Sequence, residues 1–389
     1  MSWTGRTRHI ERPPIAAINR LAAQLAADGH DLINLGQAVL GLPPPPAAIA
    51  AVERYVADNR VHTYSPDPGL PEVLGSVCGF LQDWKGIAAR PPEVMLTCGA
   101  NQAYANAVFT LSNPGDEIVL FSPYYFDHLF TIKLAGCKPV IVCCTDERQR
   151  LVPDLDAFER ALTPKTRIVT LVAPANPGGA VLSEDELLRL CRICHQRGIW
   201  LISDETYDLL TFPPSRHTSP AALHEHDRIV VLGSFSKTFA LASWRIGYMW
   251  GPETLQEEAV KVQDALVVCA PVASQWAVHG ALKDVESFRG PAVEELTQRR
   301  DSLLSGLLDI PGLPPFLPDG ATFILTQIPA SLSSVDFATD LLTATGIISV
   351  PGAAFGEASR NMVRFSFGNQ EVPRLQEAIK RLKGHMLRA

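Results

Sequence analysis

The sequence predicts an α/β protein built on a mostly parallel seven-stranded sheet covered by helices, with a second, smaller α+β domain. Short apolar segments alternate with longer segments of helical periodicity from residue 93 to residue 250, and this alternation is typical of a parallel sheet covered on both faces. The chain has 389 residues, more than one core usually serves, so we expect two domains. The predicted strands are Val94–Thr97, Glu117–Phe121, Lys138–Cys143, Ile168–Val172, Trp200–Ser203, Ile229–Leu232 and Ile246–Trp250.

Helical patterns separate and flank these strands. Pro43–Pro46 belongs to an extended connector between the first two of them, because a run of prolines cannot lie inside a helix or a central strand. Ser183 and Glu186 have the spacing of a capping box at the start of one helix. The predicted helices are 13–28, 47–58, 101–111, 125–135, 184–197, 253–268, 272–284 and 291–308.

A change of pattern after Pro311-Gly-Leu-Pro-Pro predicts the smaller domain. We expect a large domain over residues 47–290 and a small domain that combines residues 1–46 with residues 291–389. The later segments read in turn as strand, helix, strand, strand and helix, at 321–327, 335–345, 347–349, 362–367 and 371–387.

Composition excludes several classes of function. The net charge is −7 and no block is rich in lysine or arginine, which argues against nucleic acid or an anionic membrane as the main partner. No apolar run approaches the roughly 18–20 residues that cross a bilayer, and the N-terminus lacks an apolar signal core, so we expect a cytoplasmic protein. Cys191 and Cys194 alone have a zinc-like spacing, without a second ligand pair, so we expect no metal and reduced thiols.

Lys237 follows the apolar strand Ile229–Leu232, inside the segment Gly233–Phe239. Burial disfavours the charged form of a lysine, and a lysine that is partly neutral is a good Schiff-base nucleophile. A lysine considered alone would be better explained as a surface residue at a strand end.

Polar residues also follow the other strands, where ligands bind on such sheets. Gly99 opens a helix whose free amides suit an anion, although it could simply form a turn. Asn176 is held extended by the proline after it, and it too could belong to a simple turn. Asp204 is costly at a strand end unless it meets a cation or caps a helix, and Glu205 could be a solvated neighbour. Arg245 has the fork-shaped group that binds phosphate.

In chain order these motifs resemble the class I/II aminotransferases, pyridoxal-phosphate enzymes of fold type I, from about Asn34 to the C-terminus. The most specific element is Ser-Phe-Ser-Lys at 234–237 with an arginine eight residues beyond the lysine. Gly99–Gln102, Pro123-Tyr-Tyr-Phe and Lys261-Val-Gln-Asp are most similar to the aromatic and methionine aminotransferase branch. The other motifs are Tyr-Tyr at 124–125, Asn-Pro-Gly-Gly at 176–179, Asp-Glu-Thr-Tyr at 204–207 and Arg-Phe-Ser-Phe-Gly at 364–368.

The resemblance implies a role for each matching residue. Lys237 should hold pyridoxal 5'-phosphate as a Schiff base and then transfer the substrate's α-proton. Asp204 should pair with the pyridine nitrogen. Tyr125 should stack on the ring, although it could be a core aromatic or exchange roles with Tyr124. Tyr207 and Asn176 should bind the phenolic oxygen, and the phosphate should be held by Ala100, Asn101, Gln102, Ser234, Ser236 and Arg245.

The resemblance also implies how substrate and subunits meet. Arg364 should clamp the substrate α-carboxylate, with Gly36 allowing close backbone approach and Asn176 beside it. An isolated arginine in a strand would otherwise be a solvated edge residue. Tyr64 should reach the cofactor phosphate of a neighbouring subunit, which implies a homodimer with shared active sites.

One loop departs from the family pattern. The usual Leu-Gly-x-Gly-x-Pro is replaced by Leu35-Gly-Gln-Ala-Val-Leu-Gly. No second arginine stands out in the sequence as a partner for an acidic substrate side chain. We therefore expect ping-pong transfer from an apolar or aromatic L-amino acid to a 2-oxo acid. A pyridoxal-phosphate-dependent lyase, cyclase or oxidase is the alternative. A non-catalytic pyridoxal-phosphate-binding regulator is disfavoured, because residues 1–33 contain no basic recognition helix.

Overall fold

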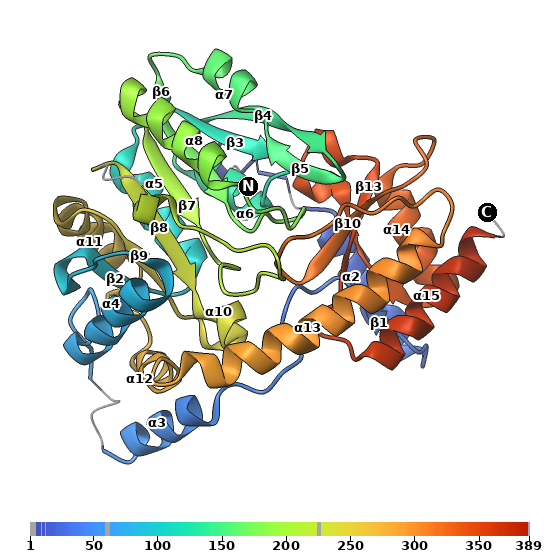
Figure 1. Cartoon of the computed structure of the whole chain (residues 1–389), viewed down its shortest axis with the longest axis horizontal. Coiled ribbons are helices and arrows are strands. Elements are labelled where there is room, and N and C mark those ends of the chain that lie inside the picture. Colours follow the sequence, from blue (N-terminus) through green and yellow to red (C-terminus); the bar gives the residue numbers. More distant parts are fainter. Residues whose placement is uncertain (1–4, 9, 12, 59–62, 224–226, 388–389) are drawn as a thin grey trace.

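The computed structural model describes residues 5–8, 10–11, 13–58, 63–223 and 227–387. Its largest sheet has the order β2-β9-β8-β7-β6-β3-β4-β5, and the strands from β8 through β4 run parallel (Figure 1). The predicted fold class is confirmed, with all seven predicted strands present and an eighth, β5, added antiparallel at the edge. The strands are β2 Val94–Thr97, β3 Glu117–Ser122, β4 Lys138–Glu147, β5 Arg150–Pro153, β6 Thr166–Val172, β7 Trp200–Asp204, β8 Ile229–Ser234 and β9 Gly247–Trp250.

Helices cover both faces of this sheet, so its strands are apolar on both sides. In β7, for example, Leu201 packs with the core under one set of helices and Ile202 with the core under the other set. This alternation follows from the two-residue period of a strand. The first face is covered by α4 Pro71–Lys85, α7 Leu155–Ala161, α8 Glu184–Arg197 and α12 Val272–Ala281, and the second by α5 Ala100–Leu111, α6 Phe126–Leu134 and α11 Glu253–Val267.

The helix predictions succeed where capping or periodicity is strong. The Ser183 capping box is confirmed, with Ser183 N donating to Glu186 Oε2 at 2.6 Å and Glu186 N donating to Ser183 Oγ at 3.3 Å. Helices α4 and α7 were not predicted from the sequence. The predicted start of α13 at Pro291 was wrong, because the helix spans Val285–Leu308 with that proline inside. The predicted start relied on the preference of proline for the first turn of a helix, a preference that Pro291 does not follow.

A second group of elements has its own core and two small sheets, one antiparallel and one parallel. The strands β10 Phe323–Gln327, β13 Met362–Ser366 and β12 Val350–Pro351 pair antiparallel, and β1 Ile33–Asn34 pairs with β11 Ile347–Ile348. These strands and helices form the other side of the molecule, joined to the large sheet by α13 (Figure 1). The domain boundaries stay a prediction. The remaining helices are α1 Gly5–Arg8, α2 Ile15–Ala27, α3 Pro46–Val56, α9 Pro220–Leu223, α10 Phe235–Thr238, α14 Ser334–Thr345 and α15 Val372–Met386.

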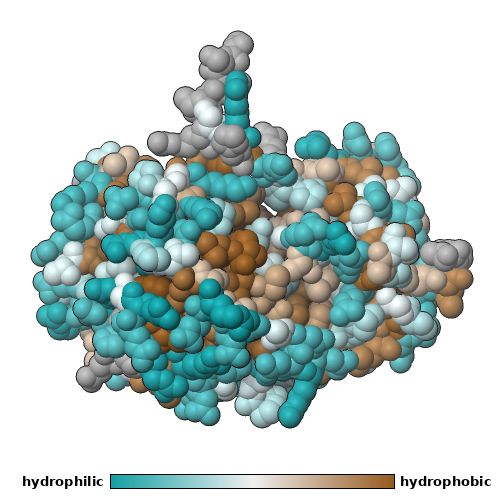
Figure 2. Space-filling model, turned by 90° about the horizontal axis from the view of Figure 1, so that it is seen from above, coloured by the Kyte–Doolittle hydropathy of each residue, from teal (hydrophilic) through white to brown (hydrophobic). Residues whose placement is uncertain are grey.

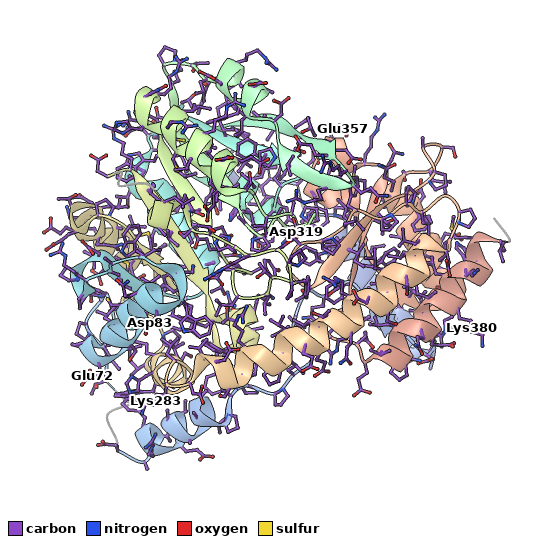
Figure 3. All side chains as sticks on the ribbon, viewed as in Figure 1. Glu72, Asp83, Lys283, Asp319, Glu357 and Lys380 are labelled. Atoms are coloured by element: carbon purple, nitrogen blue, oxygen red, sulfur yellow. The ribbon has the colours of Figure 1, made fainter. Side chains whose placement is uncertain are left out.

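Asp319 lies centrally, where the two groups of elements meet (Figure 3). Its carboxylate accepts hydrogen bonds from Arg150 Nε at 2.8 Å, Val181 N at 3.0 Å and Ser215 Oγ at 2.8 Å. These contacts fix the segment before β10 to two loops of the large sheet. Seen from above, much of the surface is hydrophilic, with hydrophobic residues gathered near its middle (Figure 2). Among the described residues, no helix is both long and apolar enough to cross a membrane.

Candidate active site

A cavity of about 570 Å³ lies at the carboxyl ends of β6, β7 and β8, and residues of β11, β12 and β13 line its other side. All the predicted site residues except Gln102 and Tyr64 line this cavity. Strand ends therefore bring together side chains that lie far apart in the sequence, as expected for a parallel sheet. The predicted residues that line the cavity are Gly36, Ala100, Asn101, Tyr125, Asn176, Asp204, Tyr207, Ser234, Ser236, Lys237, Arg245 and Arg364.

Lys237 enters the cavity from α10, directly after β8. Burial and the positive charges of Arg364 and Arg245 lower the pKa of Lys237 from its usual 10.5 to about 8. In the part of the chain that the structure describes, its ammonium has no hydrogen bond or ion pair. Gly233 in β8 packs closely against Tyr248 of β9, since a Cβ on Gly233 would lie 2.1 Å from the Tyr248 ring. Lys237 is thus partly neutral and available, which are the properties of a nucleophilic amine.

An anion subsite lies beside Lys237, at the N-terminus of α5. Arg245 Nη2 donates to the carbonyl of Cys98 at 3.3 Å, and its Nη1 lies 3.5 Å from Ser236 Oγ. A Cβ on Gly99, whose φ is +81°, would lie 2.6 Å from Arg245 Nη2. Glycine therefore lets the guanidinium approach the free amides of Ala100 and Asn101. A guanidinium, helix amides and serine hydroxyls together suit a phosphate group.

Asp204 ends β7 and is 4% exposed. Its Oδ2 lies 3.1 Å from His128 Nε2, and its Oδ1 accepts from the amide and the hydroxyl of Thr206 at 3.1 and 2.6 Å. The sequence analysis missed His128, although it lies one helical turn after Tyr125. The ring of His128 packs on Tyr104 with centroids 4.1 Å apart. Asp204 is therefore oriented from one side and presents its carboxylate to the cavity.

Two tyrosines line the cavity near Asp204. Tyr125 donates its hydroxyl hydrogen to Asp127 Oδ2 at 2.6 Å, and Asn101 Nδ2 donates to the same oxygen at 2.8 Å. Burial raises the pKa of Tyr207, which is 4% exposed, and of Tyr125. Tyr124 does not line this cavity and packs near Gly356 instead, so the geometry favours Tyr125 for a stacking role.

Arg364 lies in β13 and is 6% exposed, so it is no solvated edge residue. Its guanidinium donates to Asn176 Oδ1 and to the carbonyl of Gly36, both at 2.9 Å. The rings of Phe323 and Phe355 lie 4.8 and 5.1 Å from its central carbon. Burial lowers the pKa of Arg364 to about 10, and its Nε has no partner among the described residues. Such a buried cation without a carboxylate partner can bind an anionic group of a ligand.

Gln102 and Tyr64 lie outside the cavity. Gln102 Oε1 accepts from Cys98 N at 2.5 Å, so this side chain closes the turn before α5. Tyr64 is 81% exposed on this chain. Glu205 also differs from expectation, because it is fully buried rather than solvated, with Oε2 2.7 Å from Lys85 Nζ.

The cavity residues fit pyridoxal 5'-phosphate. Arg245 and the α5 amides suit its phosphate, Asp204 suits a protonated ring nitrogen, and the unpaired Lys237 suits its aldehyde. Among the described residues, no group of three potential metal ligands is present. The cavity is that of a fold type I pyridoxal-phosphate enzyme.

Comparison with known proteins identifies the family. Residues 30–382 match the family "Aminotransferase class I and II", and the chain belongs to this family of pyridoxal-phosphate-dependent enzymes. An aromatic aminotransferase of Arabidopsis thaliana is 33% identical, over 97% of this chain and 94% of that protein. A probable aspartate/prephenate aminotransferase of Thermus aquaticus is 32% identical, over 97% of both chains. The solved structure of a mutant aspartate aminotransferase from Thermus thermophilus is similar with a TM-score of 0.93 at 29% identity, covering 99% of each chain.

Proposed function

We propose that this aminotransferase moves the amino group of an apolar or aromatic L-amino acid to a 2-oxo acid by a ping-pong mechanism. The observation that carries this proposal is that one cavity holds two buried cations, Lys237 and Arg364, that have no carboxylate partner among the described residues. The cofactor, when bound, supplies an electrophilic aldehyde and a ring that accepts electrons from the substrate's α-carbon.

The residues of the chain divide the remaining work. Arg364 binds the substrate α-carboxylate and orients the α-carbon toward Lys237, while Asn176 and Gly36 hold the guanidinium in place. Lys237 Nζ takes the α-proton, because an amine with a pKa of about 8 exchanges protons readily near neutral pH. Asp204, oriented by His128, keeps a proton on the ring nitrogen.

The walls of the cavity favour an uncharged substrate side chain. Among the described residues, its only lysine and arginine side chains are Lys237, Arg245 and Arg364, which already have the roles above. A second carboxylate on the substrate would therefore enter without a cation. The names of the relatives span aromatic, aspartate and prephenate substrates and do not choose among them. The apolar part of the wall includes Ile15, Val39, Phe126, Val172, Ile348 and Val350.

The homodimer with shared sites and the cytoplasmic location stay predictions. An 81% exposed Tyr64 outside the cavity fits a residue that acts in a neighbouring subunit. Light scattering tests the dimer directly. Tyr64→Phe should weaken binding of pyridoxal 5'-phosphate, and a monomeric enzyme with full activity would contradict this part of the proposal.

Mixing the holoenzyme with single L-amino acids, without any 2-oxo acid, tests the reaction. We expect loss of the visible cofactor absorbance, formation of one equivalent of 2-oxo acid and accumulation of pyridoxamine phosphate, strongest with aromatic and apolar donors. A lyase would instead release ammonia and regenerate the starting absorbance. Multiple turnovers without an added oxo acid would therefore overturn the proposal.

A further inference from the structure

Lys85 is another buried lysine, on a helix that covers the large sheet, and it lies behind the turn that carries Asp204 and Tyr207. It is the last residue of α4, and its side chain is 2% exposed. Its Nζ lies 2.7 Å from Glu205 Oε2 and 2.6 Å from Asp208 Oδ2. Two carboxylates of one turn thus hold an ammonium from a distant helix.

Strand alternation gives this turn two chemically different faces. Asp204 shares a face with Ile202, under α5 and α6, where it meets His128. Glu205 continues the opposite face, that of Leu201, which lies under α4. Asp204 lines the cavity and Glu205 does not, so neighbouring carboxylates serve different partners.

On the face toward α4, both carboxylate oxygens of Glu205 have partners. Glu205 Oε1 accepts from Ser203 Oγ at 2.8 Å and from Ser219 Oγ at 2.7 Å, and its Oε2 lies 3.3 Å from His217 Nε2. Burial opposes the charge of Glu205, but Lys85 and His217 outweigh burial and hold its pKa below the usual range. Burial likewise opposes the charge of Lys85, but its two carboxylates keep its pKa well above 10.5. The ion pairs therefore persist over the working pH range of an enzyme.

We propose that Lys85 is a positioning residue of the aminotransferase reaction, whose two ion pairs fix the Asp204–Asp208 turn and so place Asp204 and Tyr207 at the cofactor. The proposal rests on the roles proposed above for those two residues. Asp208 N donates to the carbonyl of Glu205 at 3.2 Å, so the two carboxylates that Lys85 holds belong to one compact turn. A displacement of either carboxylate moves the backbone between them, which carries the Tyr207 side chain.

The test is Lys85→Met in the full-length enzyme. We expect binding of pyridoxal 5'-phosphate, followed by absorbance well below the unfolding temperature, to weaken at least about tenfold. We expect kcat to fall by about 100-fold, the usual cost of a displacement near 1 Å in an active site. KM for the amino acid should change by less than about twofold, because Arg364 is untouched. Lys380→Met, at an exposed position of α15, is the matched control and should leave all three values unchanged (Figure 3).

Loss of thermal stability alone, with wild-type cofactor affinity and kcat, would show that Lys85 only stabilises the fold and would overturn the proposal. If Lys85→Met does not fold, Asp208→Asn decides, because it leaves the Glu205 ion pair in place. For Asp208→Asn we expect weaker cofactor binding and a lower kcat with a nearly unchanged KM, all by smaller factors than for Lys85→Met. Wild-type cofactor affinity in Asp208→Asn would contradict the proposal. Wild-type cofactor binding by Asp204→Ala would contradict the role proposed above for Asp204. This result would be independent of the result for Lys85.

Discussion

Two buried lysines of this protein show how the same side chain can serve opposite purposes. Lys85 lies between two carboxylates, within 2.7 Å of each, and its pKa is held well above 10.5. Lys237 lies near two guanidinium groups, and its pKa is lowered to about 8. A buried charge is costly unless it is paired. The chain therefore neutralises one lysine internally and leaves the other to be satisfied by a ligand.

Two buried arginines repeat the comparison. Arg299 is 3% exposed and donates to Glu295 and to the carbonyl of Gly368, so its charge has a partner within the chain. Arg364 is 6% exposed and contacts only neutral oxygens and aromatic rings among the described residues. The difference indicates that burial of a cationic side chain does not by itself mark a ligand-binding site, whereas burial of a cation without a counter-charge does.

The largest expected effect is that of removing the unpaired lysine. Lys237→Ala should lower turnover by at least about 10⁴-fold, since it removes both the nucleophile and the proton-transfer group. The absorbance of the Schiff base with Lys237 should disappear while the phosphate subsite still binds pyridoxal phosphate as the free aldehyde. Measurable turnover near the wild-type rate would contradict the assignment, and exposed Lys380→Ala is the control.

Removing the unpaired arginine should have the next largest effect. Arg364→Leu should reduce kcat/KM by about 10²–10³-fold, because a buried charge-assisted carboxylate contact is worth about 2–5 kcal/mol when one partner is removed. Cofactor affinity should stay near the wild-type value, since Arg364 is not part of the phosphate subsite. Steady-state kinetics with two amino donors checks this, and an unchanged KM would contradict a carboxylate role.

A smaller effect is expected at the phosphate subsite. Gly99→Ala places a Cβ 2.6 Å from Arg245 Nη2 on a backbone with φ of +81°, so cofactor affinity should fall by about tenfold. Gly79→Ala is the matched control, because it lies in α4 with nothing within 4 Å of the added Cβ. That variant should bind the cofactor normally and gain about 0.5–1 kcal/mol of stability. Equal cofactor affinity in both variants would contradict the proposed role of Arg245 in binding the phosphate.

The comparison also shows which features the sequence predicted. The strands and the residues at their ends were predictable, because apolar strand patterns and the motifs that follow them are local. Parallel strands then bring Asn176, Asp204 and Lys237 to one edge regardless of the detailed packing. The edge strand β5 was missed because its four residues carry little pattern.

Partners that come from distant elements were not predictable. Glu205 was taken as a possible solvated neighbour because nothing near it in the sequence offers a cation. Its partner Lys85 is 120 residues away and ends a helix that the sequence analysis did not predict. His128 was missed for the same reason, since its contact with Asp204 joins α6 to β7.

The stability of the apoenzyme tests the central claim most directly. A lysine whose pKa falls from 10.5 to about 8 on folding destabilises the apoenzyme fully below pH 8, and this cost fades as the pH rises toward 10.5. Lys85 has the opposite sign, because its raised pKa stabilises the fold throughout this range.

We therefore expect Lys237→Met to raise the unfolding free energy of the apoenzyme by up to about 3 kcal/mol at pH 7.5, and by much less at pH 10. Lys85→Met should lower it by about 3–5 kcal/mol at both pH values, since it removes the ammonium that both buried carboxylates contact. Denaturant unfolding of both variants and the wild type measures these differences. Opposite signs at pH 7.5 support the account, and a loss of stability in both variants would contradict it.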